Sequence, residues 1–155
     1  MKSIIVYYSR KGRTQKIART WAHKTGASRL EIVPMGYRGT LKEHMKYLLC
    51  TLFRREMELD LYNVDFTKYD RIVLMVPVIC GMMSAPMRSF VRQEAGVLHN
   101  VEYVIVHKGI FARQPKLVWW LDKTIGETHV ACSTIHQRFN KEYNVRHIDG
   151  NSILK

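Results

Sequence analysis

The chain alternates short apolar runs with stretches in which apolar residues recur at helical spacing. SIIVYY (Ser3–Tyr8) is continuously apolar, which is typical of a strand buried on both faces of a sheet. The same reasoning predicts strands at Arg29–Pro34, Asp70–Pro77, Val101–His107 and Thr128–Ile135, and helices over residues 14–26, 40–57, 87–98 and 115–125. The second of these helices carries a strong apolar stripe, formed by Leu41, Met45, Leu48, Leu49, Leu52 and Phe53.

Strands that alternate with helices predict an α/β fold with a parallel sheet covered by helices. No repeat, low-complexity tract or linker divides residues 1–155, so we expect a single domain. Ligands on such sheets bind beyond the carboxyl ends of the strands. The informative residues should therefore lie in three loops that follow strands, over residues 9–14, 78–86 and 108–114.

Positive charge is the main departure from an ordinary composition. The formal net charge is +12, from 25 Lys and Arg against 13 Asp and Glu, and no acidic residue precedes Glu31. Such a surplus attracts an anionic partner: nucleic acid, an acidic lipid surface, an acidic protein or a phosphorylated ligand. A solvated basic face is the alternative. Basic residues do not interleave with aromatic ones as in nucleic-acid modules, which disfavours nucleic acid.

Other residue classes mainly exclude functions. No apolar stretch is long enough to span a bilayer and the N-terminus lacks a secretory signal pattern, so we expect a cytoplasmic protein. The three cysteines and seven histidines lack metal-ligand spacing, so no metal site is predicted. No nucleophile elbow or carboxylate pair is evident, and the catalytic residues, if there are any, stay unidentified.

The first loop leaves two interpretations open. Gly12 permits backbone geometry that a side chain would obstruct, Ser9 and Thr14 supply hydroxyl groups, and the next helix points its free N–H groups toward the loop. These features suit a phosphate, but they also suit a plain strand-to-helix turn. Neither the Walker spacing nor G-x-G-x-x-G is present.

IIVYYSRKGRTQKIA (Ile4–Ala18) resembles the first strand, phosphate loop and first helix of the flavodoxin-like flavoproteins, whose loop is typically [TS]-x-[TS]-G-x-T. Lys11 replaces the middle hydroxyl residue of that pattern. The resemblance implies FMN as the cofactor. It assigns the phosphate to the first loop, through Ser9, Arg10, Lys11, Gly12, Arg13 and Thr14.

IVLMVPVICGMMSAPMRSFV (Ile72–Val91) resembles the third strand and flavin loop of the same family, often P-V-[YW]-x-G-x-x-[AP]-P-x-x-x-F. Ile79 occupies the position at which this pattern usually has an aromatic residue. The resemblance assigns contacts with the flavin ring to Pro77, Val78, Ile79, Cys80, Gly81 and Met82. For Cys80 we expect a small buried hydrophobe rather than a redox thiol.

The third loop, HKGIFARQP, follows the fourth predicted strand, where the family often supplies a second contact to the ring. Gly109 would allow close approach, and Phe111 would either stack on the flavin or pack in the core. Lys108 is the candidate for the pyrimidine edge, where a positive charge would favour reduction.

The resemblance covers Lys2 to about Ile135 and implies a flavodoxin-like, doubly wound parallel five-stranded sheet with strand order 2-1-3-4-5. The tail lacks a convincing apolar stripe, so we expect a reduced or atypical C-terminal helix, or else an added strand at YNVRHI. A thinly covered sheet face would favour a homodimer.

Three functions follow from the resemblance. The first is an FMN-binding flavodoxin-like redox protein that transfers electrons; family members that do so are acidic, so this basic chain would need an acidic redox partner protein. The second is an FMN-dependent oxidoreductase of the protoporphyrinogen oxidase or quinone reductase type. Those oxidases are basic and associate peripherally with membranes, so an anionic membrane surface would suit this charge. The third is a non-redox binding module that has lost the flavin.

Overall fold

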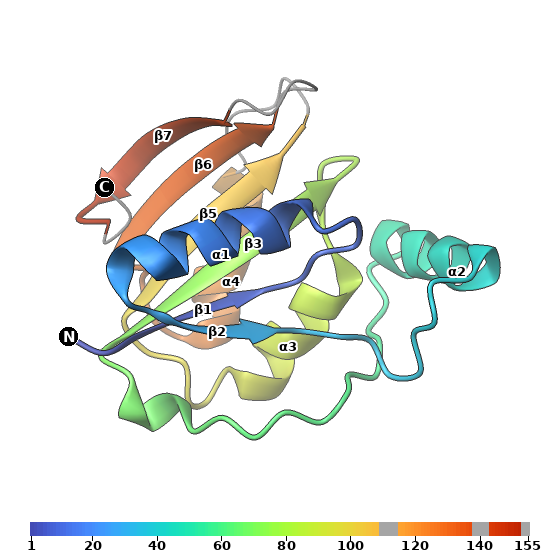
Figure 1. The fold of residues 1–155 in the computed structure, drawn as a ribbon, viewed down its shortest axis with the longest axis horizontal. Coiled ribbons are helices and arrows are strands. Elements are labelled where there is room, and N and C mark those ends of the chain that lie inside the picture. The colour runs from blue at the N-terminus through green and yellow to red at the C-terminus, as the bar shows by residue number, and fades with distance from the viewer. Residues whose placement is uncertain (109–114, 138–142, 153–155) are drawn as a thin grey trace.

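The computed structural model describes residues 1–108, 115–137 and 143–152. Strands and helices alternate along these residues, as the apolar pattern predicts (Figure 1). The elements are β1 (Ser3–Tyr7), α1 (Arg13–Thr25), β2 (Ser28–Glu31), α2 (Leu41–Leu52), the 3₁₀ helix η1 (Phe66–Lys68), β3 (Arg71–Ile79), β4 (Met82–Met83), α3 (Ala85–Glu94), β5 (Val101–His107), α4 (Pro115–Ile125), β6 (Ala131–Gln137) and β7 (Tyr143–Gly150).

The sheet has the order β2-β1-β3-β5-β6-β7, and the short β4 pairs with β3 outside this path. Strands β2, β1, β3, β5 and β6 are parallel neighbours, so the five predicted strands have the predicted order. Two strands come in addition. β4 is antiparallel to β3, and β7 is antiparallel to β6. The expected reduced C-terminal helix is therefore wrong for residues 143–150, where the added strand is found; β7 satisfies backbone groups that β6 would otherwise expose at the sheet edge.

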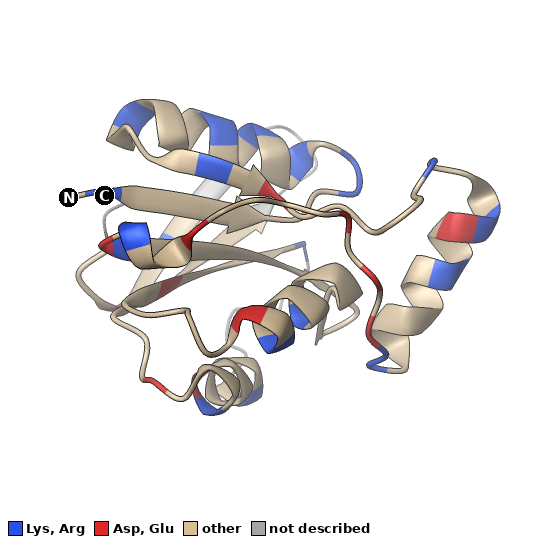
Figure 2. Cartoon of the chain, turned by 90° about the horizontal axis from the view of Figure 1, so that it is seen from below, with Lys and Arg blue, Asp and Glu red and all other residues tan. Residues whose placement is uncertain are grey.

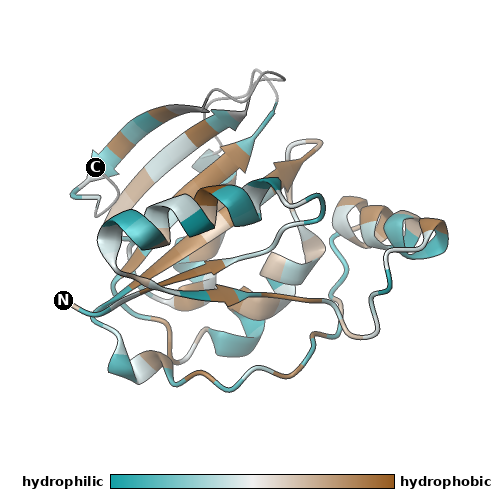
Figure 3. Cartoon of the chain, viewed as in Figure 1, coloured by the Kyte–Doolittle hydropathy of each residue, from teal (hydrophilic) through white to brown (hydrophobic). Residues whose placement is uncertain are grey.

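Helices lie on both faces of the sheet. α1 covers one face, where Ile17 packs with Val104, and α3 and α4 cover the other, where Phe90 and Leu121 pack with Leu74 (Figure 1). The central strands β1, β3 and β5, which lie between these layers, are mostly hydrophobic (Figure 3). No described helix is long and apolar enough to cross a membrane.

The predicted second helix is shorter than expected. α2 begins at a capping box, in which Thr40 accepts from the backbone N–H of Glu43 and the Glu43 side chain accepts from that of Thr40. It ends at Leu52 instead of continuing to Met57, because Arg54 adopts a left-handed φ of 54°.

Most of the apolar stripe of α2 is exposed. α2 projects from one side of the sheet (Figure 1), and only Tyr47 and Thr51 are buried within it. Tyr47 packs on Tyr8, with ring centroids 5.3 Å apart, and the Thr51 hydroxyl accepts a hydrogen bond from Ala85 N at 3.2 Å. The exposed residues of the stripe are Leu41, Met45, Leu49, Leu52 and Phe53.

A histidine ties β7 to α4. His129 Nδ1 lies 3.0 Å from Asp122 Oδ2 of α4, and Nε2 lies 3.2 Å from Asp149 Oδ2 of β7. Burial alone would lower the pKa of His129, but the hydrogen bonds to Asp149 and Asp122 outweigh it and raise that pKa above its usual value. When it is protonated, His129 bridges the carboxylates of Asp122 and Asp149.

The residues after β7 are held by a buried ion pair. Glu102 of β5 is fully buried and pairs with Arg71 of β3 at 3.2 Å. Arg71 also donates to Asn151 O at 2.6 Å, and the Ser152 hydroxyl donates to Glu102. The buried carboxylate of Glu102 is therefore held by two partners, Arg71 and Ser152.

Candidate ligand-binding cleft

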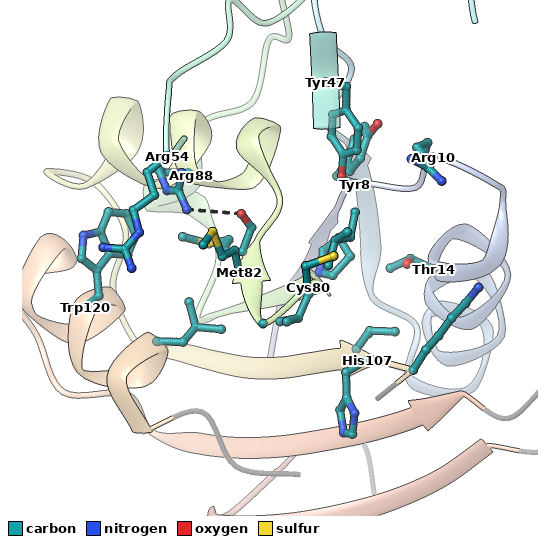
Figure 4. Close-up of a pocket in the computed structure, with 18 of the residues that line it drawn as sticks. Tyr8, Arg10, Thr14, Tyr47, Arg54, Cys80, Met82, Arg88, His107 and Trp120 are labelled. Carbon is teal, nitrogen blue, oxygen red and sulfur yellow. Dashed lines mark hydrogen bonds between the residues drawn. The ribbon is translucent and has the colours of Figure 1, made fainter. Parts of the chain in front are cut away.

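A cleft of about 1290 Å³ lies where the first two predicted loops meet the end of β5 (Figure 4). The predicted site residues that line it are Ser9, Arg10, Lys11, Arg13, Thr14, Pro77, Val78, Ile79, Cys80, Gly81, Met82 and Lys108. Gly12 is not in the lining, although it shapes the first loop, and Gly109 and Phe111 lie outside the described residues. The structure thus brings the first two loops and Lys108, the first residue of the third, to one place, as the topology predicts.

The first loop leaves the start of α1 without a side-chain cap. Gly12 is the N-cap residue at φ 73°, a conformation that favours glycine, and no side chain accepts a hydrogen bond there. The first turn contains no acidic residue, and Lys16 N donates to Gly12 O at 3.0 Å. The N–H groups that precede Lys16 in the helix and the positive end of the helix dipole are therefore available to an anion.

The charge of the cleft has a single sign. Every charged side chain in its described lining is Lys or Arg. Lys and Arg also occur in the loop that precedes α1 and along the helix α1 (Figure 2). Burial lowers the pKa of Lys108, and the nearby positive charges of Arg13, Lys11 and Arg10 lower it further. Cations from separate loops are thus close enough to repel one another, and an anion between them would relieve that repulsion.

The second loop is a tight hairpin. Val78 pairs with Met83 and Ile79 with Met82, which leaves Cys80 and Gly81 at the tip with φ values of 51° and 76°. A positive φ at both central residues is what a type I′ turn requires. The expectation of Cys80 as a small buried hydrophobe is wrong, because the turn places it at an exposed tip in the cleft wall.

Sequence reasoning did not identify a pair of tyrosines, Tyr8 and Tyr47, in the cleft lining. Tyr8 and Tyr47 both line the cleft, and the Arg10 guanidinium lies 5.8 Å from the centre of the Tyr47 ring. Burial raises the pKa of Tyr47 to about 12 and raises that of Tyr8 as well, so both phenols stay neutral. Tyr8 could have been found from its place directly before the loop. The sequence did not indicate Tyr47, because the apolar stripe of α2 lies on a different face of the helix from Tyr47.

The far end of the cleft was also missed. Arg54, Arg88 and Trp120 gather there, opposite Arg10 and Thr14, with Cys80 and Met82 between the two groups (Figure 4). The remaining lining residues that the sequence did not suggest are Met83, Arg92, Val106, His107, Pro115, Lys116, Leu117 and Trp119. Two adjacent tryptophans at residues 119–120 are the signal that could have pointed to this end.

Comparison with solved structures identifies the fold. A flavoprotein of Lactobacillus acidophilus in complex with FMN has a TM-score of 0.67 at 21% identity, over 86% of this chain and 92% of that chain. The apo form of the Lactobacillus acidophilus flavoprotein has a TM-score of 0.59 at 19% identity, over 86% and 91%. A flavodoxin of Streptococcus pneumoniae has a TM-score of 0.52 at 18% identity, over 92% and 88%. No protein-family model and no curated protein sequence matches this chain. The chain therefore has the fold of the flavodoxin-like flavoproteins.

Proposed function

We propose that this protein binds FMN in the cleft and is a redox protein that transfers electrons. The observation that carries the proposal is the uncapped start of α1 at Gly12, surrounded by Arg10, Lys11 and Arg13. A phosphate there would accept hydrogen bonds from the first-turn N–H groups and meet several positive charges at once. The similar Lactobacillus flavoprotein, which contains FMN, supports this choice of ligand.

The flavin ring would lie along the hairpin of residues 77–82. Ile79 and Met82 offer apolar surface, the tip at Cys80 and Gly81 offers accessible backbone, and Lys108 offers a positive charge. Bound FMN would supply the redox chemistry, while the protein holds and orients it and sets the charge around it. The roles of Gly109 and Phe111 stay predictions.

Titration with FMN, followed by flavin fluorescence, tests the proposal. We expect Arg13→Gln to weaken FMN binding, because it removes a cation beside the phosphate; a hydrogen bond to a charged group contributes about 1.5–3 kcal/mol. Arg19→Gln is the matched control, since Arg19 is an exposed arginine on the same helix but outside the cleft. Riboflavin, which lacks the phosphate, should bind both variants and the wild type with equal, weaker affinity.

Two results would contradict this assignment. Absence of FMN binding would leave the non-redox module as the better interpretation. Equal weakening by Arg13→Gln and Arg19→Gln would show that overall charge, rather than the loop, attracts the ligand.

The size of the cleft favours a second candidate, an FMN-dependent oxidoreductase of the protoporphyrinogen oxidase or quinone reductase type. A volume of about 1290 Å³ exceeds the range of roughly 300–1000 Å³ usual for one small-molecule site, which leaves space for a substrate beside the flavin. Turnover of a quinone or a porphyrinogen by the FMN-loaded protein would favour the enzyme. Electron passage to a partner protein without such turnover would favour the carrier.

A further inference from the structure

The end of the cleft away from the first loop contains a buried arginine without an acidic partner. Arg88 lies on α3 and is only 6% exposed. Its Nη2 donates to Met83 O at 3.4 Å, and its buried Nη1 has no hydrogen-bond partner in the described chain. A guanidinium carries five N–H donors, and burial of such a group without partners is costly. In a cleft wall, it is suited to an anion.

Neighbouring residues increase the positive charge at this end. Arg54 and Arg92 also line the cleft; burial and the charges of these two arginines lower the pKa of Arg88, while the charge of Glu56 acts in the opposite direction. Arg92 pairs with Glu56, whereas neither Arg54 nor Arg88 has a carboxylate within ion-pair distance among the described residues. Two of the three arginines at this end of the cleft therefore lack an acidic partner in the described part of the chain.

Next to these cations the wall is apolar and aromatic. Trp120 and Leu117 line the cleft from α4, and both are partly buried against the core. The Arg92 guanidinium lies 5.8 Å from the centre of the Trp120 ring. Met82 and Met83 of β4 complete the same region of the lining. A flat ring would find an indole face and thioether groups here.

We propose that this end of the cleft is a second binding site, for a flat aromatic molecule that carries a carboxylate. The carboxylate would accept hydrogen bonds from Arg88 and Arg54, and the ring would pack on Trp120. The inference rests on the proposed function in one respect, namely that FMN occupies the end of the cleft nearest Gly12. The second ligand would then lie beside the flavin, across the hairpin tip (Figure 4).

Binding of 2-naphthoate, measured by calorimetry on the purified protein with and without saturating FMN, tests the proposal. The probe 2-naphthamide has the same ring without the charge. We expect the amide to bind at least about tenfold more weakly than the carboxylate, as expected for loss of a hydrogen bond to a charged group. Arg88→Met should clearly reduce that difference, since only Arg54 then remains to donate to the carboxylate, and Arg19→Met, outside the cleft, should preserve it. Equal binding of the two probes, or a difference that Arg88→Met leaves unchanged, would overturn the proposal.

A second pair of measurements separates ligand binding from a structural role. If Arg88 serves a ligand, Arg88→Met should leave the melting temperature unchanged or raise it, because a buried charge without an acidic partner is removed. A clear fall in melting temperature would assign Arg88 to the fold and overturn the proposal. Trp120→Leu should weaken both probes by the same factor; unchanged binding of both would also count against the site.

FMN titrations of the same samples distinguish failure of this site from failure of the proposed function. Naphthoate binding that depends on Arg88 in a protein without affinity for FMN would support the second site and reject the flavin. FMN binding without naphthoate binding would support the proposed function and reject the second site. Competition between the two ligands, or weakening of FMN binding by Arg88→Met as strong as that by Arg13→Gln, would show one shared site and overturn the inference.

Discussion

Replacement of Gly150 by alanine tests how β7 closes the edge of the sheet. Gly150 ends β7 at a φ of 70°, opposite Ala131 of β6. A Cβ at this position would lie 2.1 Å from Val130 O and 2.7 Å from Ala131 Cα. Both are backbone atoms, so no side-chain rotation relieves the overlap. The strands would have to separate by more than 1 Å, since ordinary contact begins near 3.4 Å.

Gly26 provides a matched control for this substitution. It caps the end of α1 at the same φ of 70°, but a Cβ there would meet no atom within 4 Å. Gly26→Ala should therefore cost only the left-handed strain of an L-residue, about 1–2 kcal/mol. Gly150→Ala carries the same strain, and the steric overlap adds about 1–3 kcal/mol. The two variants should differ by about 2 kcal/mol in the free energy of unfolding.

Urea denaturation of both variants gives this difference directly. With a slope of about 2 kcal/mol per M, the midpoint of Gly150→Ala should lie about 1 M below that of Gly26→Ala. Hydrogen exchange would show whether the end of β7 opens locally, through faster exchange of amides near residues 147–150. Equal midpoints together with unchanged exchange would refute the close approach of the two strands.

Two further predictions concern the pH dependence and the packing of the fold. Because the pKa of His129 is raised on folding, the stabilisation that it contributes should be complete below its unfolded pKa of about 6.5 and should disappear as the pH rises through the raised folded value. The unfolding free energies of the wild type and His129→Gln should therefore differ most below about pH 6.5 and converge as the pH rises through that folded value, with His23→Gln as an exposed control. A difference that does not change with pH would contradict the bridge. Leu49→Ala should cost less than about 0.5 kcal/mol because the side chain is 45% exposed, whereas Leu121→Ala should cost about 2–5 kcal/mol in the core. Similar losses for the two leucines in thermal unfolding would place α2 in the core after all.

The parallel strands were predictable because their apolar runs have one physical explanation. Val73, Leu74 and Met75 follow one another without a polar residue, and all three are fully buried between α1 on one face and α3 and α4 on the other. A strand that must be apolar on both faces cannot be confused with a surface element. The loops that follow such strands were predictable for the same reason, since parallel topology brings their carboxyl ends to one edge.

The orientation of α2 was not predictable, because periodicity identifies an apolar face but not what covers it. Its helix is held by Tyr47 and Thr51, which contact Tyr8 and Ala85 from distant parts of the chain. The far end of the cleft escaped prediction for a related reason. Arg88 belongs to a segment that the family pattern places in register, but only packing shows that it is buried without an acid.

The acidic residues of the described chain explain why the cleft stays positive. Most of them have structural partners: Glu43 caps α2, Asp65 caps η1, Glu102 pairs with Arg71, Asp122 and Asp149 hold His129, Glu56 pairs with Arg92, and Glu31 accepts hydrogen bonds from Tyr7 and Gln15. None of them lines the cleft, whose cations come from both of its ends. Like charges held together in a partly desolvated cavity oppose folding, so binding of anions between them would stabilise the folded protein. Anionic groups at the two ends of the cleft, a phosphate near Gly12 and a carboxylate near Arg88, would supply that balance.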